Sequence, residues 1–270
     1  MPMMKPLVPI TALLERRRRD SDRVAFEITD DWAQGRTTFG GLIAALAVAA
    51  MRDVTGSDWP LRALQASFIG PVLRDLVVQV HLLRQGRHVR QVQATLSTQG
   101  KVAAVLLGVF GEARASSVRP LHAQRPPVAI APEATSELPF IEGVTPDFIA
   151  HLDPRWAEGD LPYSGGSHWH SRIHVRLRDA AADAELTSVL LADMPPSPAV
   201  GQLTRPAPAS SVSWEIELVP PVTPPDPTGW WRADTEAIAA GDGYVNQRTT
   251  LWAPDGTLAA LGYQVAAVYG

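Results

Sequence analysis

The chain contains no cysteine. This absence excludes a disulfide framework, a thiolate nucleophile and a cysteine-based metal site. With 270 residues, of which 46% are hydrophobic and 19% are charged, the chain is long enough to bury a substantial core without cross-links. We therefore expect a globular protein that is stabilised by packing alone.

The sequence also has little excess charge and no long apolar run. Its formal net charge of −4 is too small to indicate a nucleic acid partner. The longest apolar runs, such as Val102 to Phe110, fall far short of the ~20 residues that a membrane helix needs. The start of the chain lacks the apolar region and the cleavage site of a signal peptide. We expect a cytoplasmic protein that binds neither nucleic acid nor membrane.

Three common enzyme motifs are missing as well. The sequence has no G-x-S-x-G nucleophile elbow, no G-x-x-x-x-G-K-[ST] phosphate loop and no G-x-G-x-x-G dinucleotide fingerprint. These absences argue against elbow-type serine hydrolysis, NTP hydrolysis and Rossmann redox chemistry.

The first part of the chain has the pattern of one helix and a meander of strands. Arg36 to Arg52 predicts a helix that is apolar on every side, which is typical of a buried helix. A short strand, Val24 to Ile28, precedes this helix. Turn signals separate the runs that follow, which indicates an antiparallel meander. These strand-like runs are Leu61 to Ile69, Leu76 to Leu83, His88 to Thr98 and Val102 to Phe110.

A similar pattern returns after a proline-rich segment, Glu112 to His151, which we interpret as a linker. Ser171 to Arg178 alternates as a strand does, and Ala181 to Met194 then predicts a helix that Pro195 and Pro196 end. Further strand-like runs follow, which are Ser211 to Val219, Trp230 to Ala239, Gly243 to Trp252 and Thr257 to Val268.

The order of strand, helix and four strands thus occurs twice, which indicates an internal duplication. It predicts an α+β protein of the double-hotdog type, in which each half wraps a long antiparallel sheet round one helix. We expect the N-terminal half at residues 1–111, the linker at 112–151 and the C-terminal half at 152–270. Two halves side by side can join their sheets and so remove exposed edges.

The sequence resembles the acyl-CoA thioesterase II family, a group of double-hotdog enzymes. The resemblance covers nearly the whole chain outside the linker, and it rests on the order and spacing of short motifs. In the first half these are Phe39-Gly40-Gly41, Ser67-Phe68 followed by Pro71, and Arg84-Gln85-Gly86-Arg87. In the second half they are Leu190 to Asp193, Ser210 to Ser213 with the following strand to Pro220-Pro221, Leu251 to Gly256, and Gln264.

The resemblance implies which residues are catalytic. Family members hydrolyse fatty acyl-CoA with an Asp, a Thr or Ser, and a Gln, which correspond by position to Asp193, Ser211 and Gln264. Ser210 is a rival for the hydroxyl if the strand register differs by one residue. The first half has Gly108 at the position that matches Gln264, and alanines where Asp193 would align. We therefore expect one active site per chain.

Thioester hydrolysis needs an activated water and a place for the developing oxyanion. Asp193 can accept the proton of the water or attack the carbonyl itself, and the sequence leaves both roles open. Ser211 and Gln264 would hold the water in place. Gly40 and Gly41 open a helix, where they would either bind the oxyanion or allow close packing of the helix against the sheet.

Basic residues are candidates for binding the phosphates of coenzyme A. Arg87, His88 and Arg90 are weak candidates near a hairpin, and the run from Arg16 to Arg19 is a rival. Three histidines share one strand parity, at positions 168, 170 and 174, but arginines on the same face argue against a metal site. We expect neither a metal nor a redox cofactor.

The sequence therefore predicts that an Asp-activated water hydrolyses an acyl-CoA thioester to a free acid and coenzyme A. One alternative is a non-catalytic acyl-CoA binding protein that has kept the fold. Another is a hotdog enoyl-CoA hydratase or dehydratase, although this chemistry normally uses an Asp and His pair, and no histidine lies near Asp193 in the sequence. The resemblance also implies a homodimer or homotetramer.

Overall fold

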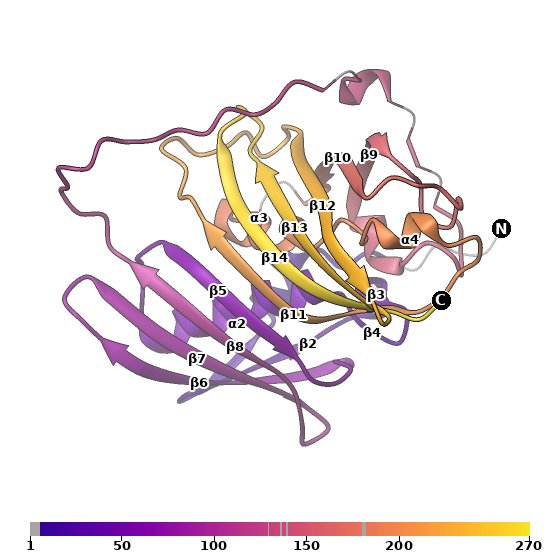
Figure 1. Cartoon of the computed structure of the whole chain (residues 1–270). Helices are drawn as coiled ribbons and strands as arrows, with labels where there is room; N and C mark the ends of the chain where they lie inside the picture. The colour runs from indigo at the N-terminus through magenta and orange to yellow at the C-terminus, as the bar shows by residue number, and fades with distance from the viewer. Residues whose placement is uncertain (1–5, 129, 136, 139, 180–181) are drawn as a thin grey trace.

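The computed structural model describes residues 6–128, 130–135, 137–138, 140–179 and 182–270. Over these residues, one continuous antiparallel sheet of twelve strands curls round two central helices, α2 (Gly40–Thr55) and α3 (Ala184–Ala192) (Figure 1). The first half contributes β1 (Arg18–Asp20), β2 (Arg23–Glu27), β5 (Leu61–Phe68), β6 (Asp75–Gln85), β7 (Val89–Thr98) and β8 (Lys101–Gly111). The second half contributes β9 (Leu152–Gly159), β10 (His170–Leu177), β11 (Ala209–Leu218), β12 (Trp231–Gly241), β13 (Tyr244–Trp252) and β14 (Leu258–Val268).

The order of the strands reveals the relation between the halves. The sheet runs β1-β2-β6-β7-β8-β5 and continues β11-β14-β13-β12-β10-β9, so the second half repeats the first in reverse. The halves join where β5 pairs antiparallel with β11, with Gln65 directly opposite Glu215. An approximate two-fold axis therefore passes near this pair. The predicted double hotdog is confirmed, and the ends of the predicted strands differ from the observed ones by no more than two residues.

Helix α2 is buried on every side, as its composition predicts. Every residue from Gly41 to Met51 is buried, and each large aliphatic side chain among them contributes ~1.5–3 kcal/mol. The predicted start at Arg36 is wrong, because Thr37 and Thr38 form the short strand β4 (Thr37–Thr38), which pairs with β3 (Ala33–Gln34). The helix ends at Thr55, and its C-cap is Gly56, whose left-handed backbone (φ 59°) allows its N–H to bond to the carbonyl of Arg52.

Helix α3 is shorter and begins at a side-chain cap. The carboxylate of Asp183 accepts hydrogen bonds from the N–H groups of Glu185 and Leu186, which satisfies donors that the first turn leaves unpaired. The predicted first residue, Ala181, lies outside the described residues. The helix ends at Ala192, and Asp193 is its C-cap. The two prolines that follow prevent its continuation.

Several elements have no clear signal in the sequence. They are α1 (Ile10–Glu15), β1, β9, α4 (Ala199–Gln202) and the short 3-10 helices Asp30–Trp32 (η1), Pro132–Ala134 (η2) and Asp147–His151 (η3). Strand β9 contains Pro154, which the sheet tolerates because β9 is an edge strand. The long segment after β8 runs over the outside of the second half to η2 (Figure 1). Buried Arg232 holds it there by donating from Nη1 to the carbonyl of Pro126 at 2.7 Å.

Among the helices in the described ranges, none is long and apolar enough to cross a membrane.

Candidate active site

The carboxylate of Asp193 lies between the ends of two helices. It follows the last turn of α3, where the helix dipole disfavours a negative charge. The first turn of α2 offsets this cost. The N-cap residue of α2, Phe39, supplies no side-chain hydrogen bond, so the N–H groups of this turn need other acceptors. The backbone N–H of Gly41 donates to Asp193. Asp193 thus caps a helix of the other half.

The two glycines of α2 allow this close approach. A Cβ on Gly40 would lie 2.6 Å from Oδ2 of Asp193 and 3.4 Å from Cζ of Phe68. A Cβ on Gly41 would lie 2.7 Å from the backbone carbonyl oxygen of Leu190 in α3. Cβ contacts of 2.6 and 2.7 Å essentially never occur, so a side chain at Gly40 would displace the carboxylate and one at Gly41 would clash with the backbone of α3. The close packing is between α2 and α3, whereas the sequence suggested packing of α2 against the sheet.

Gln264 connects Asp193 to Ser211. Its Nε2 donates to Oδ1 of Asp193 at 2.9 Å and to Oγ of Ser211 at 2.7 Å. Gln264 lies on β14 and Ser211 on the neighbouring strand β11, and the register of this pair shifts between Ser211 and Ser213. Bulges of this kind change the direction of a side chain. The structure therefore brings together all three residues that the resemblance implied.

The competing hydroxyl of Ser210 makes a different contact. Its Oγ lies 3.4 Å from the backbone oxygen of Ser211, and the residue is exposed. Ser211 is thus the serine whose hydroxyl meets Gln264.

Burial raises the pKa of Asp193 to about 7. The hydrogen bonds from Gln264 and from the N–H of Gly41 act in the opposite direction, because they favour the ionised form. The residue as a whole is partly exposed, whereas its carboxyl group is buried. A carboxylate with this pKa can take up and release a proton close to neutral pH.

Sequence reasoning missed Gln247, which holds the other side of the Gln264 amide. Its Nε2 donates to Oε1 of Gln264 at 2.7 Å, and the two residues face each other across β13 and β14. Gln247 is 3% exposed. The signal was present in the alternation of β13, where Val245, Gln247 and Thr249 all point inward, and a buried polar residue in such a position needs a partner.

The matching place in the first half has no such site. Gly108 lies opposite Leu64 on β5, as Gln264 lies opposite Trp214 on β11. A Cβ on Gly108 would lie 2.7 Å from Sδ of Met51, so a methionine fills the space.

An ion pair lies beside this methionine instead. Arg52 binds Glu185 through Nε and Nη2 at 3.0 and 2.5 Å, and Glu185 also accepts from the N–H of Leu61 at 2.7 Å. These groups join the end of α2 to the start of α3, as Asp193 joins the end of α3 to the start of α2.

The weak candidates for coenzyme A binding lie elsewhere. Arg90 lies over the ring of Trp59 at 4.5 Å, and its Nη1 donates to the carbonyl of Thr55, the last residue of α2. His88 pairs with Glu112 at 2.8 Å, and Arg87 is exposed. The length of α2, ~24 Å, separates these residues from Gly40. The structure does not bring them to Asp193.

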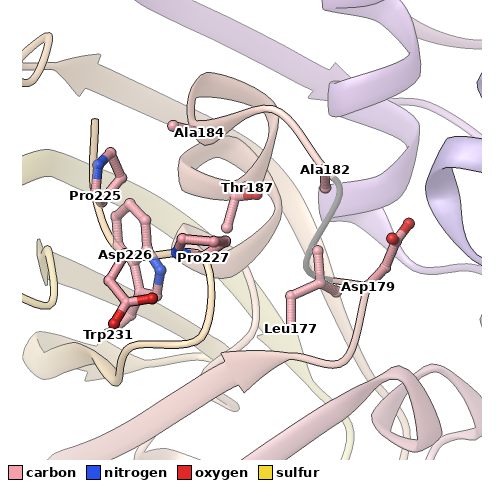
Figure 2. Close-up of a pocket in the computed structure, with 9 residues that line it drawn as sticks. All are labelled: Leu177, Asp179, Ala182, Ala184, Thr187, Pro225, Asp226, Pro227 and Trp231. Atoms are coloured by element: carbon pink, nitrogen blue, oxygen red, sulfur yellow. The ribbon is translucent and has the colours of Figure 1, made fainter.

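Two cavities lie in matching places in the two halves. The smaller has a volume of about 40 Å³, which is room for little more than a water molecule. Figure 2 shows it between Thr187 of α3, the loop from Pro225 to Pro227, and the end of β10. The larger, about 330 Å³, lies beside Thr38 and Val72. Only the larger reaches the size of ordinary ligand pockets. One of its lining residues, Thr38, is two positions before Gly40 in the sequence.

No metal centre emerges from the residues that the structure describes, where no group of three or more His, Asp or Glu side chains could hold an ion. His168 pairs with Asp160 at 2.9 Å, and the ring of His170 lies edge-on to that of His168. His174 is buried apart from them, and its Nε2 contacts the backbone oxygen of Ile130 at 3.3 Å.

Two family models match the chain. The acyl-CoA thioesterase N-terminal domain matches residues 28–111, and the acyl-CoA thioesterase C-terminal domain matches residues 132–268. No curated protein matches the chain significantly.

Solved structures share the fold. A conserved hot dog protein of unknown function from Alicyclobacillus acidocaldarius superposes with a TM-score of 0.84 at 18% identity, over 98% of this chain and 99% of that one. A structure described as a thioesterase II from Thermobifida fusca gives 0.82 at 18% identity, over 99% and 100%. An acyl-CoA thioesterase II from Mycobacterium marinum gives 0.74 at 15% identity, over 96% and 98%.

Proposed function

The chain belongs to the acyl-CoA thioesterase family, and from that premise we propose that Asp193, Ser211 and Gln264 hydrolyse the thioester of its acyl-CoA substrate. The products are a free acid and coenzyme A. One observation carries the assignment, which is that a single amide nitrogen of Gln264 bonds to both the carboxylate and the hydroxyl. Three polar groups from three separate segments converge there on one point.

Asp193 acts as the general base in this proposal. Its ionised carboxylate takes a proton from a water, and the hydroxide forms a bond to the thioester carbonyl carbon. The carbon–sulfur bond then breaks, and the leaving coenzyme A thiolate takes up the proton that Asp193 received. A pKa of about 7 suits both transfers, since a base works best when its pKa is close to the working pH.

Ser211 positions the water, and Gln264 orients Ser211 and Asp193 towards it. The Ser211 oxygen accepts from Gln264, which leaves the hydroxyl proton and one lone pair to hold the water. Good positioning of reacting groups contributes up to ~7–11 kcal/mol in the best intramolecular cases. The pair therefore supports the chemistry although neither member exchanges a proton with the substrate.

The first turn of α2 supplies the oxyanion site. The N–H of Gly41 bonds to Asp193, so we assign most of the stabilisation of the oxyanion to the N–H of Gly40. Both lie at the positive end of the helix dipole, and donors aimed at the developing charge are worth ~3–4 kcal/mol each in comparable sites.

The larger cavity is the proposed place for the part of the substrate next to the thioester. Thr38 lines this cavity and precedes Gly40, which faces the carboxylate of Asp193, by two positions in the sequence. Leu73, on its rim, is 40% exposed, so Leu73→Trp should fill the cavity and raise KM with little effect on kcat. Leu82→Trp, on an exposed part of β6, is the control. Equal KM values for both variants would exclude the cavity.

We also propose a division of the chain at residues 111 and 151, a homodimer or homotetramer, a cytoplasmic location, and weak contacts of Arg87, His88 and Arg90 with coenzyme A. No specific observation favours a non-catalytic binding protein. None favours a hydratase either, because the hydrogen bonds of Asp193 go to Gln264 and Gly41 and not to a histidine.

Release of free thiol from a panel of acyl-CoA substrates tests the assignment. Asp193→Asn should reduce kcat by about 10²–10⁴. Asp255→Asn, which removes an exposed carboxylate from the β13–β14 turn, should leave kcat unchanged. If Asp193→Asn turns over every substrate as fast as the wild type, the mechanism is wrong.

A further inference from the structure

Gln247 lies where its amide can decide the orientation of the Gln264 amide. The two side chains face each other on adjacent strands, and Nε2 of Gln247 donates to Oε1 of Gln264 at 2.7 Å. Gln247 is buried, at 3% exposure, so water does not compete for this contact.

The hydrogen bonds of Gln264 are satisfied in one orientation only. Its nitrogen faces two acceptors, Oδ1 of Asp193 and Oγ of Ser211. A half-turn of the amide would place its oxygen against the carboxylate, where the two oxygens repel each other. The same half-turn would turn the nitrogen of Gln264 towards the donor nitrogen of Gln247. Gln247 therefore adds a second penalty to the unproductive orientation.

Among the described residues, the bond to Gln264 is the one hydrogen bond of the Gln247 side chain. Its Oε1 is buried and has no hydrogen-bond partner within the described part of the chain. A buried carbonyl oxygen without a partner costs free energy, and the bond from Nε2 to Gln264 is the contact that offsets this cost.

The first half provides an internal comparison. Val92 lies opposite Gly108 on β7 and β8, as Gln247 lies opposite Gln264 on β13 and β14. Val92 is fully buried. The same place in the same framework thus accepts an apolar residue when its neighbour carries no catalytic amide.

We propose that Gln247 is a positioning residue for the hydrolysis, which acts by holding the Gln264 amide with its nitrogen towards Asp193 and Ser211. The inference rests on the proposed function of Asp193. It predicts that loss of Gln247 harms the catalytic step more than substrate binding. It also predicts a weaker bond between Gln264 and the ionised Asp193, and therefore a higher apparent pKa for the base.

The test compares Gln247→Met with Thr249→Val. The methionine keeps the volume and removes the donor. Thr249 lies two residues along the same strand with its side chain also inward, and its hydroxyl pairs with Thr235 and not with Gln264. Thr249→Val therefore perturbs a buried polar pair of β13 without touching the site.

We expect Gln247→Met to lower kcat about 10-fold to 100-fold, the usual range for supporting residues, with KM changed by less than about twofold. Its acid limb in kcat/KM should move to higher pH by about half a unit or more. Thr249→Val should keep both the wild-type kcat and the wild-type limb. The proposal would be overturned if Gln247→Met kept the wild-type kcat and the wild-type acid limb, or if kcat fell as much in Thr249→Val as in Gln247→Met.

A second variant covers the case in which Gln247→Met does not fold. Gln247→Glu keeps the length and shape of the side chain, but its ionised carboxylate can only accept a hydrogen bond. It should therefore lower kcat at high pH, and wild-type kcat in this variant at high pH would contradict the inference. Asp193→Asn separates the two hypotheses: if it is inactive while the Gln247 variants are normal, only the role of Gln247 is wrong.

Discussion

Gly40 faces Asp193 so closely that a Cβ on the glycine would lie 2.6 Å from the carboxylate oxygen Oδ2. The start of the helix in one half and the end of the helix in the other thus meet with no room for a side chain. The proposed catalytic carboxylate and the proposed oxyanion donors come from different halves. The fusion of the halves in one chain keeps these groups together.

This contact makes Gly40→Ala a sensitive test of the site. The new methyl group should displace the carboxylate, and a misplacement of about 1 Å can cost about 100-fold in rate. We expect kcat/KM to fall by that order while thermal unfolding stays cooperative. Gly241→Ala is the control, because a Cβ there meets no atom within 4 Å. Equal activity of the two variants would show that the contact does not matter.

Ser211 and Ser210 form a matched pair for testing the hydroxyl. Ser211→Ala removes an acceptor of Gln264 and should lower kcat by about 10-fold, which corresponds to the ~1–1.5 kcal/mol of one hydrogen bond. Ser211→Thr keeps the hydroxyl and should restore most of the activity. Ser210→Ala should have no effect. A loss in Ser210→Ala with none in Ser211→Ala would transfer the role to Ser210.

The ion pair of Arg52 and Glu185 should be structural. Both side chains are largely buried, at 27% and 18% exposure, so Glu185→Gln should reduce the free energy of unfolding by about 1–3 kcal/mol without changing kcat. Glu236→Gln, which breaks the exposed pair with Arg248, should cost less than about 1 kcal/mol. Urea unfolding and thiol release measure the two effects. A loss of kcat without a loss of stability would contradict this interpretation.

The raised pKa of Asp193 also predicts how stability depends on pH. Between the ordinary value of 3.8 and about 7, the folded protein holds a proton on Asp193 that the unfolded chain has released. The free energy of unfolding should therefore fall as pH rises through this window, by at most ~1.4 kcal/mol per pH unit from this group.

Asp193→Asn lacks this ionisation and should become more stable relative to the wild type as pH rises from 5 to 8. Urea unfolding at several pH values measures the difference. A difference between the two proteins that stays constant with pH would contradict the raised pKa.

Ten of the strands were predictable because long alternating or apolar runs are separated by clear turn signals. Helix α2 was also predictable, since residues from Gly41 to Met51 are apolar all round. Its start was not, because Thr37 and Thr38 pair with β3 through contacts that are not local to the helix. Strand β9 was missed for a similar reason: it forms by pairing with β10, and Pro154 obscures its pattern.

The site was only partly readable from the sequence. The resemblance pointed to Asp193, Ser211 and Gln264, but their convergence depends on the register of β11 and β14 and on a bulge. Gln247 needed the register of a third strand. The sequence also suggested that the two glycines allow close packing of α2 against the sheet. They allow close packing against α3 instead, because a sequence does not show which element will cross a helix.

The pH dependence of kcat/KM tests the central claim that the ionised carboxylate of Asp193 is the base. The wild type should show an acid limb with an apparent pKa near 7, and Asp193→Asn should show a low rate with no such limb. The same limb in Asp193→Asn, or a wild-type rate that does not change between pH 5 and 9, would contradict the account.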